Sequence, residues 1–557
     1  MIVLPVVGVS YLALTAAKHG TPLPCDLFTD QPQRAFAMTR TKFTCLAVLL
    51  ALAAASTTMS ARADEPLPPA IQKVLDAPRF KNAHWGLLVI DLGTGKVLLA
   101  HNPDKLFAPA STTKLYSVAA ALDALGPDYR FETPVYARGI RSQDNSLHGD
   151  LVLVASGDLS LGGRTTEQGE IAFTNADHTY ATGTAQTELT APDPLAGLDD
   201  LARQVAKQLR AIEGDVLIDD RLFEHASSSG SGPDRVSPII VNDNVIDVIV
   251  SPTSLDAPAK VDWRPKSIAA TVDAQVTTTA AGGRTRVSLT SAPGNRLIVR
   301  GQIAADHAPI VHIQEVENAA AWARALFIEA LGRAGVRVSA SPLAAPDSPQ
   351  LPDRQQYSSL EKVATLVSPP FSESARLILK VSHNLHASTL PLLVAARHER
   401  FTLADGLRLE GEFLKRNGVA AEEISFGGGA GGANADFTTP SVNCQLLRMM
   451  AGRRDFAVYK RALPVLGVDG TLATAVDADS PARGKAFAKT GTLYWGDLLN
   501  KQRLLTSKAL AGYLTAKSGR ELVFSLVVNG VHLTSDEERN EIGRTLGQLC
   551  EEIYDAN

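Results

Sequence analysis

Three short polar motifs stand far apart in this chain of 557 residues, and they constrain its fold more than any other feature. They are Ser111-Thr112-Thr113-Lys114, Ser382-His383-Asn384 and Lys489-Thr490-Gly491-Thr492. Ser382 lies 271 residues after Ser111, and Lys489 lies 107 residues after Ser382. If the three motifs share one site, the intervening chain must leave that site and return to it.

The first motif supplies the parts of an activated nucleophile. A serine hydroxyl attacks poorly unless a base removes its proton. Ser111 and Lys114 are three residues apart at the start of an expected helix over 112–125, which places both side chains on one face. Lys114 can serve as the base only if burial or a neighbouring cation lowers its pKa, and Lys489 would be such a cation. Backbone N–H groups at the helix N-terminus would favour a developing oxyanion beside Ser111.

Short patterns also arise by chance, so a single motif is weak evidence, and only the order and surroundings of the three motifs indicate a shared site. Ser359-Leu360-Glu361-Lys362 repeats the first pattern, and Ser441-Val442-Asn443 repeats the second. We interpret these as a solvated helix surface or a helix start, because Ser359 leaves no room for a domain before Ser382. Lys489-Thr490-Gly491 is the rarest pattern, and it lies where a strand should lead into a C-terminal hairpin over 509–528.

The pattern of apolar and turn-forming residues changes twice along the chain, which predicts one α/β domain interrupted by another region. Residues 64–140 and 357–557 alternate between helical and strand patterns. Residues 141–356 consist mainly of short alternating runs separated by Gly, Pro, Asp and Asn, which predicts a β-rich accessory insertion. Within it, residues 160–195 are rich in Gly, Thr and Asp, and we expect them to form a long surface insertion.

The first 63 residues indicate export. Residues 38–63 combine a basic start, an apolar run rich in Ala and Leu, and small residues before a cleavage point, which is typical of a signal peptide. The apolar run is shorter than the ~20 residues that a membrane-spanning helix needs. Residues 1–37 are interpreted as a start codon assigned too early, with Met38 as the true start. We therefore expect a periplasmic protein.

Charge and residue spacing exclude several other classes of function. The net charge is −5 without a block of like charges, which argues against nucleic acid as a partner and allows at most peripheral membrane contact. His383 and His386 have no further ligands nearby in sequence, so neither a metal nor another cofactor is expected. The chain has four cysteines, Cys25, Cys45, Cys444 and Cys550. The first two fall in the expected leader, and the last two could pair, which sequence alone does not decide.

In this order and context the three motifs resemble the set of the D-alanyl-D-alanine carboxypeptidase/endopeptidase family, the class C low-molecular-mass penicillin-binding proteins. The resemblance covers roughly residues 80–550 and includes Val241-Asn242-Asp243-Asn244 and residues 464–472. In that family accessory domains are inserted after the first motif, whereas a β-lactamase has a much shorter interval there. The resemblance implies a serine β-lactamase/transpeptidase-like domain, in which helices flank an antiparallel sheet, interrupted by the insertion.

The resemblance also implies what the first two motifs do. Ser111 would attack the carbonyl of the penultimate D-alanine in a peptidoglycan stem peptide, and Lys114 would accept its proton. Ser382 would relay a proton toward the leaving amine, and Asn384 would hold the substrate amide. A water would then hydrolyse the ester on Ser111, which penicillins would also acylate.

The third motif would bind the far end of the substrate. The resemblance implies that Lys489 keeps the site electropositive and that Thr490 and Thr492 bind the terminal carboxylate, with Gly491 between them in the substrate-binding strand. The backbone N–H groups of Ser111 and Thr492 would form the oxyanion hole. The residue types in all three motifs are those that this chemistry needs.

The sequence departs from the family pattern in four places. His383 stands where Asp or Asn is usual, and residues 385–388 lack a common acidic residue. Residues 426–432 replace a more polar loop, and residues 494–508 exceed the usual link into the last strands. Two alternatives therefore stay open, a β-lactamase-related serine hydrolase and a catalytically weak peptidoglycan-binding protein. Carboxypeptidase and endopeptidase activities would use the same residues.

Overall fold

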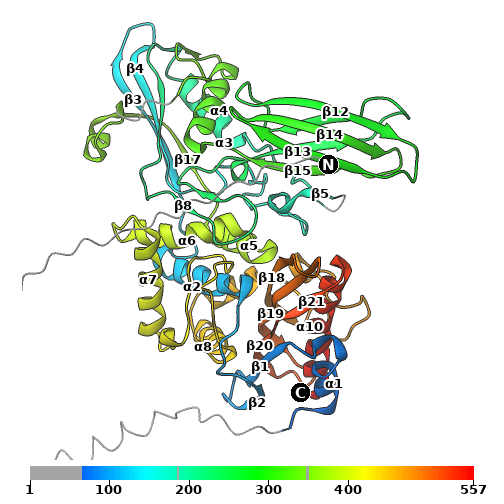
Figure 1. Cartoon of the computed structure of the whole chain (residues 1–557). Helices are drawn as coiled ribbons and strands as arrows, with labels where there is room; N and C mark the ends of the chain where they lie inside the picture. Colours follow the sequence, from blue (N-terminus) through cyan, green and yellow to red (C-terminus); the bar gives the residue numbers. More distant parts are fainter. Residues whose placement is uncertain (1–65, 185–186, 346–349) are drawn as a thin grey trace, which may run out of the picture. The chain divides into compact units, whose positions relative to one another are not determined.

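The computed structural model describes residues 66–184, 187–345 and 350–557 (Figure 1). The predicted signal peptide at 38–63 and the predicted mis-start at 1–37 lie outside the described residues, together with Cys25 and Cys45. Within the described part of the chain, no helix combines the length and the apolar character needed to cross a membrane. The described residues belong to one compact unit, Asp64–Asn557.

One antiparallel sheet carries the first and last segments of the described chain, with the strand order β18-β19-β20-β1-β2. The strands before the insertion are β1 (His84–Asp91) and β2 (Val97–His101). The strands after it are β18 (Ala486–Asp497), β19 (Gln502–Thr515), β20 (Glu521–Asn529) and β21 (Val531–Leu533), which pairs with β19. The predicted C-terminal hairpin is confirmed. Because β1 pairs with β20, the two ends of the domain are joined in one sheet.

Alternation along the strands divides this domain into two layers. Leu88 and Ile90 of β1 belong to the core shared with the middle helices, whereas Leu87 and Val89 belong to the core under the terminal helices. Successive strand residues point to opposite faces, so a strand buried on both faces is apolar throughout. The middle helices are α2 (Lys114–Leu125), α5 (Phe371–Val381), α6 (Asn384–Arg397), α7 (Leu403–Arg416), α8 (Pro440–Ala451) and α9 (Phe456–Ala462). The terminal helices are α1 (Pro69–Leu75) and α10 (Asp536–Ala556).

The region between α2 and α5 is rich in strands, as predicted. One sheet has the order β16-β6-β4-β3-β17, with β7 beside β4; a second has the order β11-β10-β15-β5, and a third has β12-β14-β13. Two helices, α3 (Ala196–Ala206) and α4 (Ala319–Arg333), accompany them. The strand bounds are β3 (Glu132–Arg141), β4 (Ser146–Val154), β5 (Thr182–Thr184), β6 (Ala211–Ile212), β7 (Val216–Asp219), β8 (Ala226–Ser227), β9 (Arg235–Val236), β10 (Val245–Ser251), β11 (Lys260–Arg264), β12 (Thr271–Thr279), β13 (Arg286–Ala292), β14 (Arg296–Ala304), β15 (Ile310–Glu315), β16 (Arg337–Val338) and β17 (Glu361–Val367).

Strands β3 and β17 lie at the two ends of this region and pair with each other. The limits predicted from the sequence, 141 and 356, fall at the end of β3 and just before β17. The sheet that closes the insertion is therefore built from residues on both sides of those limits. Pairing of β3 with β17 brings the chain back to the place it left, which allows α2 and α5 to share one core.

The prediction that residues 160–195 form a surface insertion is wrong for part of the segment. Arg164, Asp177, His178 and Thr179 are buried, with at most 5% of their surface exposed. Charge pairing accounts for the difference, because Arg164 and His178 form ion pairs with buried carboxylates. A polar segment without apolar periodicity can be buried when its charges are matched.

The two cysteines of the described chain do not pair. Cys444 and Cys550 are both free and buried. Cys444 lies in the core of the middle helices, and Cys550 lies in the core under α10. The sheet separates the two cores, so the disulfide that the sequence left open does not form.

Candidate active site

The first motif lies at a tight turn that leads into α2. Ser111 belongs to a 3-10 turn, Ala110–Thr113, and α2 begins only at Lys114, two residues later than predicted. Ala110 has φ +48, which is costly for a residue with a side chain. Ser111 stays partly exposed, whereas Lys114 is fully buried. The turn therefore presents the hydroxyl while the amine stays inside the protein.

The Lys114 amine has three oxygen partners. Its Nζ lies 2.9 Å from Ser111 Oγ, 2.6 Å from Asn384 Oδ1 and 2.7 Å from the carbonyl oxygen of Ala430. The last two oxygens only accept hydrogen bonds. When the amine is neutral, its two hydrogens serve these acceptors, and its lone pair is left facing Ser111.

Burial and a second lysine favour the neutral amine. Burial and the charge of Lys489 together hold the pKa of Lys114 well below its usual value, against a weaker opposing effect of Asp436. Lys489 is itself buried, and burial, followed by the charge of Lys508, lowers its pKa to about 7. Both burial and a neighbouring cation therefore lower the pKa of Lys114, as its role as a base requires.

The second motif joins two helices at a sharp corner. Ser382 ends α5 in the left-handed conformation, with φ +64. His383 then caps α6, because its side chain accepts a hydrogen bond from the backbone N–H of His386 over 3.3 Å. Asp and Asn are the ordinary residues for this capping task. His383 thus retains the capping role of the residue type that it replaces.

Residues of the insertion surround the second motif. The Tyr180 hydroxyl donates to the carbonyl oxygen of Ser382 and accepts the backbone N–H of Asn384 at 3.0 Å. The Asn384 side-chain amide donates to the carbonyl oxygen of Ser231 at 2.9 Å. Since Lys114 donates to the other end of the same amide, Asn384 is fixed from two directions. The insertion is therefore part of the site.

The third motif occupies the edge strand β18. Lys489 Nζ donates to Ser382 Oγ at 2.9 Å and to the carbonyl oxygen of Thr490 at 2.7 Å. A side chain at Gly491 would approach the carbonyl oxygen of Pro109 to 2.6 Å, so glycine permits β18 to lie against the turn that holds Ser111. The structure thus brings the three motifs together.

The glycine-rich loop over residues 426–432 closes the lysine side of the site. Its Ala430 carbonyl accepts from Lys114, and its Ala430 N–H donates to Ser229 Oγ of the insertion at 2.9 Å. A side chain at Gly431 would lie 1.9 Å from the carbonyl oxygen of Ala110. Glycine is therefore required where the loop touches the nucleophile turn. Asp436 fastens the loop by accepting the backbone N–H groups of Gly427, within the loop, and of Ala433, which follows it.

Behind the second motif lies a buried charge cluster, which we call the Asp243 network. The Asp243 carboxylate accepts from Arg164 and from His178 Nε2 at 2.7 Å, and its other oxygen lies 2.7 Å from His386 Nε2. His178 bridges to Asp247 at 2.6 Å, and Arg164 also pairs with Asp177. Although burial opposes it, the carboxylates of Asp247 and Asp243 raise the pKa of His178 to about 10.

Two groups in this network have the composition of metal ligands. The ligand atoms of Asp243, His383 and His386 lie within 4.8 Å of one another, as do those of Asp177, His178 and Asp243. However, Arg164 and a doubly hydrogen-bonded His178 already direct positive charge at Asp243. His383 Nδ1 accepts a hydrogen bond, which leaves the proton of the neutral ring on Nε2, facing Asp243. We interpret the cluster as an ion network, since these hydrogens and charges disfavour a dication.

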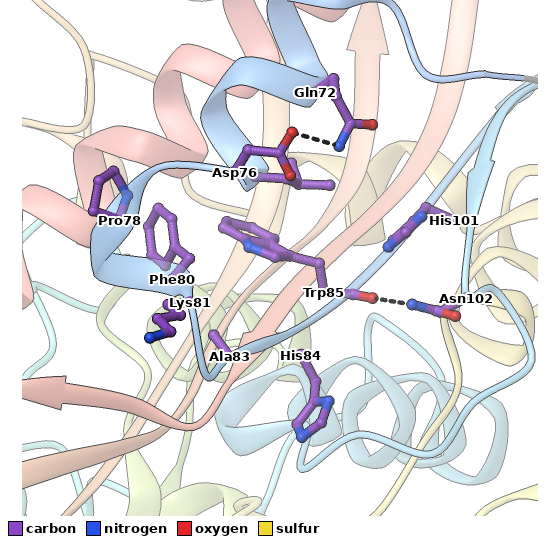
Figure 2. Close-up of a pocket in the computed structure, with 11 residues that line it drawn as sticks. Gln72, Asp76, Pro78, Phe80, Lys81, Ala83, His84, Trp85, His101 and Asn102 are labelled. Carbon is purple, nitrogen blue, oxygen red and sulfur yellow. Dashed lines mark hydrogen bonds between the residues drawn. The ribbon is translucent and has the colours of Figure 1, made fainter.

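A separate pocket lies on the α1 side of the domain. Its volume is about 490 Å³, and its lining includes Gln72, Asp76, Trp85 and Asn102. Figure 2 shows Gln72 hydrogen-bonded to Asp76, and the Trp85 carbonyl accepting from Asn102. No residue of the three motifs lines it. It therefore does not belong to the site built around Ser111.

Several residues of the site carried no signal that sequence reasoning used. Tyr180 and Ser231 come from the polar stretches of the insertion, and Lys508 comes from the strand after the third motif. Asp243 lay in a segment that the sequence singled out without giving it a role. Asn242, Asp243 and Asn244 all have positive φ, and a run of Asn and Asp is the residue pattern that tolerates such a backbone.

A comparison with known protein families gives one match over most of the chain. The model of the D-Ala-D-Ala carboxypeptidase 3 (S13) family matches residues 67–552. A D-alanyl-D-alanine carboxypeptidase from an Actinomadura species is 28% identical over 488 residues, which are 83% of this chain and 80% of the relative.

Solved structures agree on the fold. The crystal structure of penicillin binding protein 4 (dacB) from Haemophilus influenzae is similar with a TM-score of 0.65 and 20% identity, covering 87% of this chain and 99% of that one. The same Haemophilus protein complexed with a β-lactam is similar with a TM-score of 0.63. The predicted antiparallel sheet with flanking helices, interrupted by an insertion, is confirmed.

Proposed function

The chain belongs to the D-Ala-D-Ala carboxypeptidase 3 (S13) family, and on that premise we propose how its own residues do the chemistry. The enzyme is a serine peptidase that releases D-alanine from peptidoglycan stem peptides through an acyl-enzyme on Ser111. One observation carries the assignment of roles. A buried Lys114 amine, with both hydrogens engaged by acceptors, faces the Ser111 hydroxyl at 2.9 Å.

In the acylation step, Ser111 Oγ forms a bond to the carbonyl carbon of the penultimate D-alanine, and its proton moves to Lys114 Nζ. The carbonyl oxygen becomes an oxyanion, which the backbone N–H groups of Ser111 and Thr492 stabilise. Lys114 gains a positive charge at this point. Because Asn384 and the Ala430 carbonyl already accept its hydrogens, the ammonium forms without rearrangement of the site.

Collapse of the tetrahedral intermediate breaks the bond to the terminal D-alanine, whose nitrogen needs a proton. Lys489 donates a hydrogen bond to Ser382 Oγ, so the Ser382 hydrogen is free to point at the leaving nitrogen. We assign Ser382 as the relay through which the proton that Lys114 took from Ser111 reaches this nitrogen, so that Lys114 becomes neutral again. We assign Asn384 as the holder of the substrate amide. Thr490, Gly491 and Thr492 form the strand that binds the terminal carboxylate.

Deacylation repeats the chemistry with water as the nucleophile. A water adds to the ester carbonyl, its proton passes to the neutral Lys114, and the ester bond to Ser111 Oγ breaks as the hydroxyl is re-formed. Penicillins acylate the same serine, because their strained amide occupies the place of the D-Ala–D-Ala bond. No atom of this cycle requires a group from outside the protein, the substrate and water.

None of the four departures from the family pattern removes a residue that we assign to this chemistry. His383 caps α6, as Asp or Asn would, and the glycine-rich loop supplies the Ala430 carbonyl to Lys114. These contacts favour an active peptidase over a weak binding protein. Carboxypeptidase and endopeptidase activity differ in the group beyond the scissile bond, and both would use the residues assigned here.

We also propose that the enzyme works in the periplasm after removal of residues 38–63. The basic start, the short apolar run and the small residues before Asp64 support export. Peptidoglycan, the substrate of the family's reaction, lies outside the cytoplasmic membrane. Mature protein isolated from the native host should begin at Asp64, and a different N-terminus would contradict the proposal.

The reaction can be tested with defined muropeptides. Purified enzyme is incubated with a monomeric pentapeptide muropeptide and with a cross-linked dimer, and the products are weighed by mass spectrometry. Loss of one alanine from the monomer supports carboxypeptidase action, and conversion of the dimer to monomers supports endopeptidase action. If neither substrate changes while Ser111→Ala behaves like wild type, the proposed function is wrong.

A further inference from the structure

Three lysines surround Ser111 and its substrate strand without carboxylate partners. We call Lys114, Lys489 and Lys508 the lysine cluster. Their amines donate only to hydroxyl, amide and carbonyl oxygens of the protein. In the part of the chain that the structure describes, none of the three forms an ion pair. Buried amines without a carboxylate partner are costly in their charged form, and their arrangement fits an anionic ligand.

Lys508 is the member of this cluster that lies outside all three motifs. It stands on β19 directly opposite Thr492 on β18, and residues paired in this way place their side chains on one face of the sheet. Its Nζ donates to Thr492 Oγ1 at 2.9 Å. Helix α10 passes close by, and a side chain at Gly543 would lie 3.4 Å from the amine. The lysine is thus held against the substrate strand.

The direction of this hydrogen bond fixes what the Thr492 hydroxyl can do. An ammonium group has hydrogens but no acceptor, so Thr492 Oγ1 must accept. Its own hydrogen is then free to donate to another oxygen. A carboxylate placed at Thr492 would receive that hydrogen and would also lie near two positive charges, those of Lys489 and Lys508.

We propose that Lys508 is a positioning residue for the terminal carboxylate of the substrate, acting through the Thr492 hydroxyl and through its charge. The inference rests on the proposed function and adds to it a residue that selects substrates with a free carboxylate. Burial lowers the pKa of Lys508 to about 8, and Lys508 in turn lowers the pKa of Lys489. A bound carboxylate relieves this repulsion between the two amines.

The test uses two substrates that differ in one group. A peptide ending in D-Ala-D-Ala is compared with the same peptide carrying a C-terminal amide, and kcat and KM are measured for wild type, Lys508→Met and Lys508→Arg. We expect Lys508→Met to lower kcat/KM for the carboxylate substrate about tenfold or more, mainly through KM, because a charge contact at a bound ligand is lost. The amide substrate should change less than about twofold. Lys508→Arg should recover most of the loss.

Two further variants separate this role from a structural one. Lys501→Met, on the exposed turn of the same hairpin, should change neither substrate. The double variant Thr492→Val with Lys508→Met should lose less kcat/KM for the carboxylate substrate than the product of the two single losses, because Lys508 acts partly through the Thr492 hydroxyl. An equal loss on both substrates, or no loss on either, overturns the proposal for Lys508. Failure of the wild type to release D-alanine from the peptide with a free carboxylate would instead contradict the proposed function.

Discussion

Two buried charge clusters flank Asn384, and they are built in opposite ways. In the Asp243 network, Arg164 and His178 face the carboxylates of Asp177, Asp243 and Asp247. Arg264 also pairs with Asp247 at 3.0 Å, so three cations meet three carboxylates. In the lysine cluster, the buried amines of Lys114 and Lys489 meet only neutral oxygens. The charges of the Asp243 network balance one another, whereas the charges of the lysine cluster are balanced only when the site binds an anion.

The contrast explains why burial has opposite consequences in the two places. Matched charges hold the pKa values of Asp243 and His178 apart, so that both stay ionised inside the protein. Burial without a carboxylate partner, together with a neighbouring lysine charge, lowers the pKa values of Lys114 and Lys489. Lys114 thereby becomes a neutral amine that can take up a proton. The network supports the fold, and the lysine cluster supports the reaction at a cost in stability.

The largest effect should come from neutralising the lysine cluster at its centre. Lys114→Met removes the proton acceptor, and we expect D-alanine release and penicillin acylation to fall about 10⁴-fold. Because the lost amine has no carboxylate partner, the free energy of unfolding in urea should fall by no more than about 1–3 kcal/mol, the cost of leaving the Asn384 and Ala430 oxygens without a donor. Lys415→Met, in the exposed last turn of α7, is the matched control. A large drop in stability with retained activity would contradict our proposal that Lys114 serves the reaction.

The same kind of change in the Asp243 network should act on stability first. Asp243→Asn keeps the size of the side chain but leaves buried Arg164 and His178 short of one carboxylate, so unfolding free energy should fall by about 3–5 kcal/mol. Asp273→Asn, which breaks a partly exposed pair with Arg300, should cost no more than about 1 kcal/mol. Equal stability of the two variants, measured by urea unfolding, would show that the network is not built as described.

Protonation of Lys114 and Lys489 should determine how kcat/KM depends on pH. Below the pKa of Lys114 the amine is protonated and cannot act as a base, so kcat/KM rises with pH. Lys489 is cationic below its pKa of about 7, and kcat/KM should fall as pH rises through that value and the charge is lost. Lys489→Arg should move the falling limb upward, since guanidinium keeps its charge. A falling limb that stays in place would remove Lys489 from this role.

The smallest effect is expected at His383, which contacts the Asp243 network and stands between Ser382 and Asn384 in the second motif. His383→Asn keeps a capping side chain on α6, so kcat/KM should change less than about threefold, whereas His383→Ala should lose about 1 kcal/mol of stability with the cap. Thermal unfolding and D-alanine release measured on both variants check this. A large loss of activity in His383→Asn would mean that the imidazole does more than cap the helix and face Asp243.

The sequence was sufficient for the motif residues and the general architecture, because these depend on local patterns. The order of Ser111, Ser382 and Lys489 and the alternation in β19 and β20 predicted the domain and its interruption. The helix start was misplaced by two residues, since a 3-10 turn at Ser111 has the same spacing as the first turn of an α-helix.

The insertion's part in the site could not be read from the sequence. Tyr180, Ser231 and Asp243 reach Asn384 and its neighbours only through long-range packing. Tyr180 also lies in the polar segment 160–195, which the sequence suggested to be a surface insertion. Burial of this segment depends partly on charges that are matched over long distances in sequence, such as the 65 residues between His178 and Asp243. Such long-range pairing produces no periodic pattern of residues, so the sequence alone does not predict it.

The most direct measurement of the central claim is the location of a penicilloyl adduct. Native enzyme is treated with benzylpenicillin and digested, and the modified peptide is identified by mass spectrometry in wild type, Ser111→Ala and Lys114→Met. A buried neutral lysine that activates Ser111 predicts one adduct, on Ser111, formed rapidly in wild type, absent from Ser111→Ala and strongly slowed in Lys114→Met. An adduct on another residue, or full-speed labelling of Lys114→Met, would contradict it.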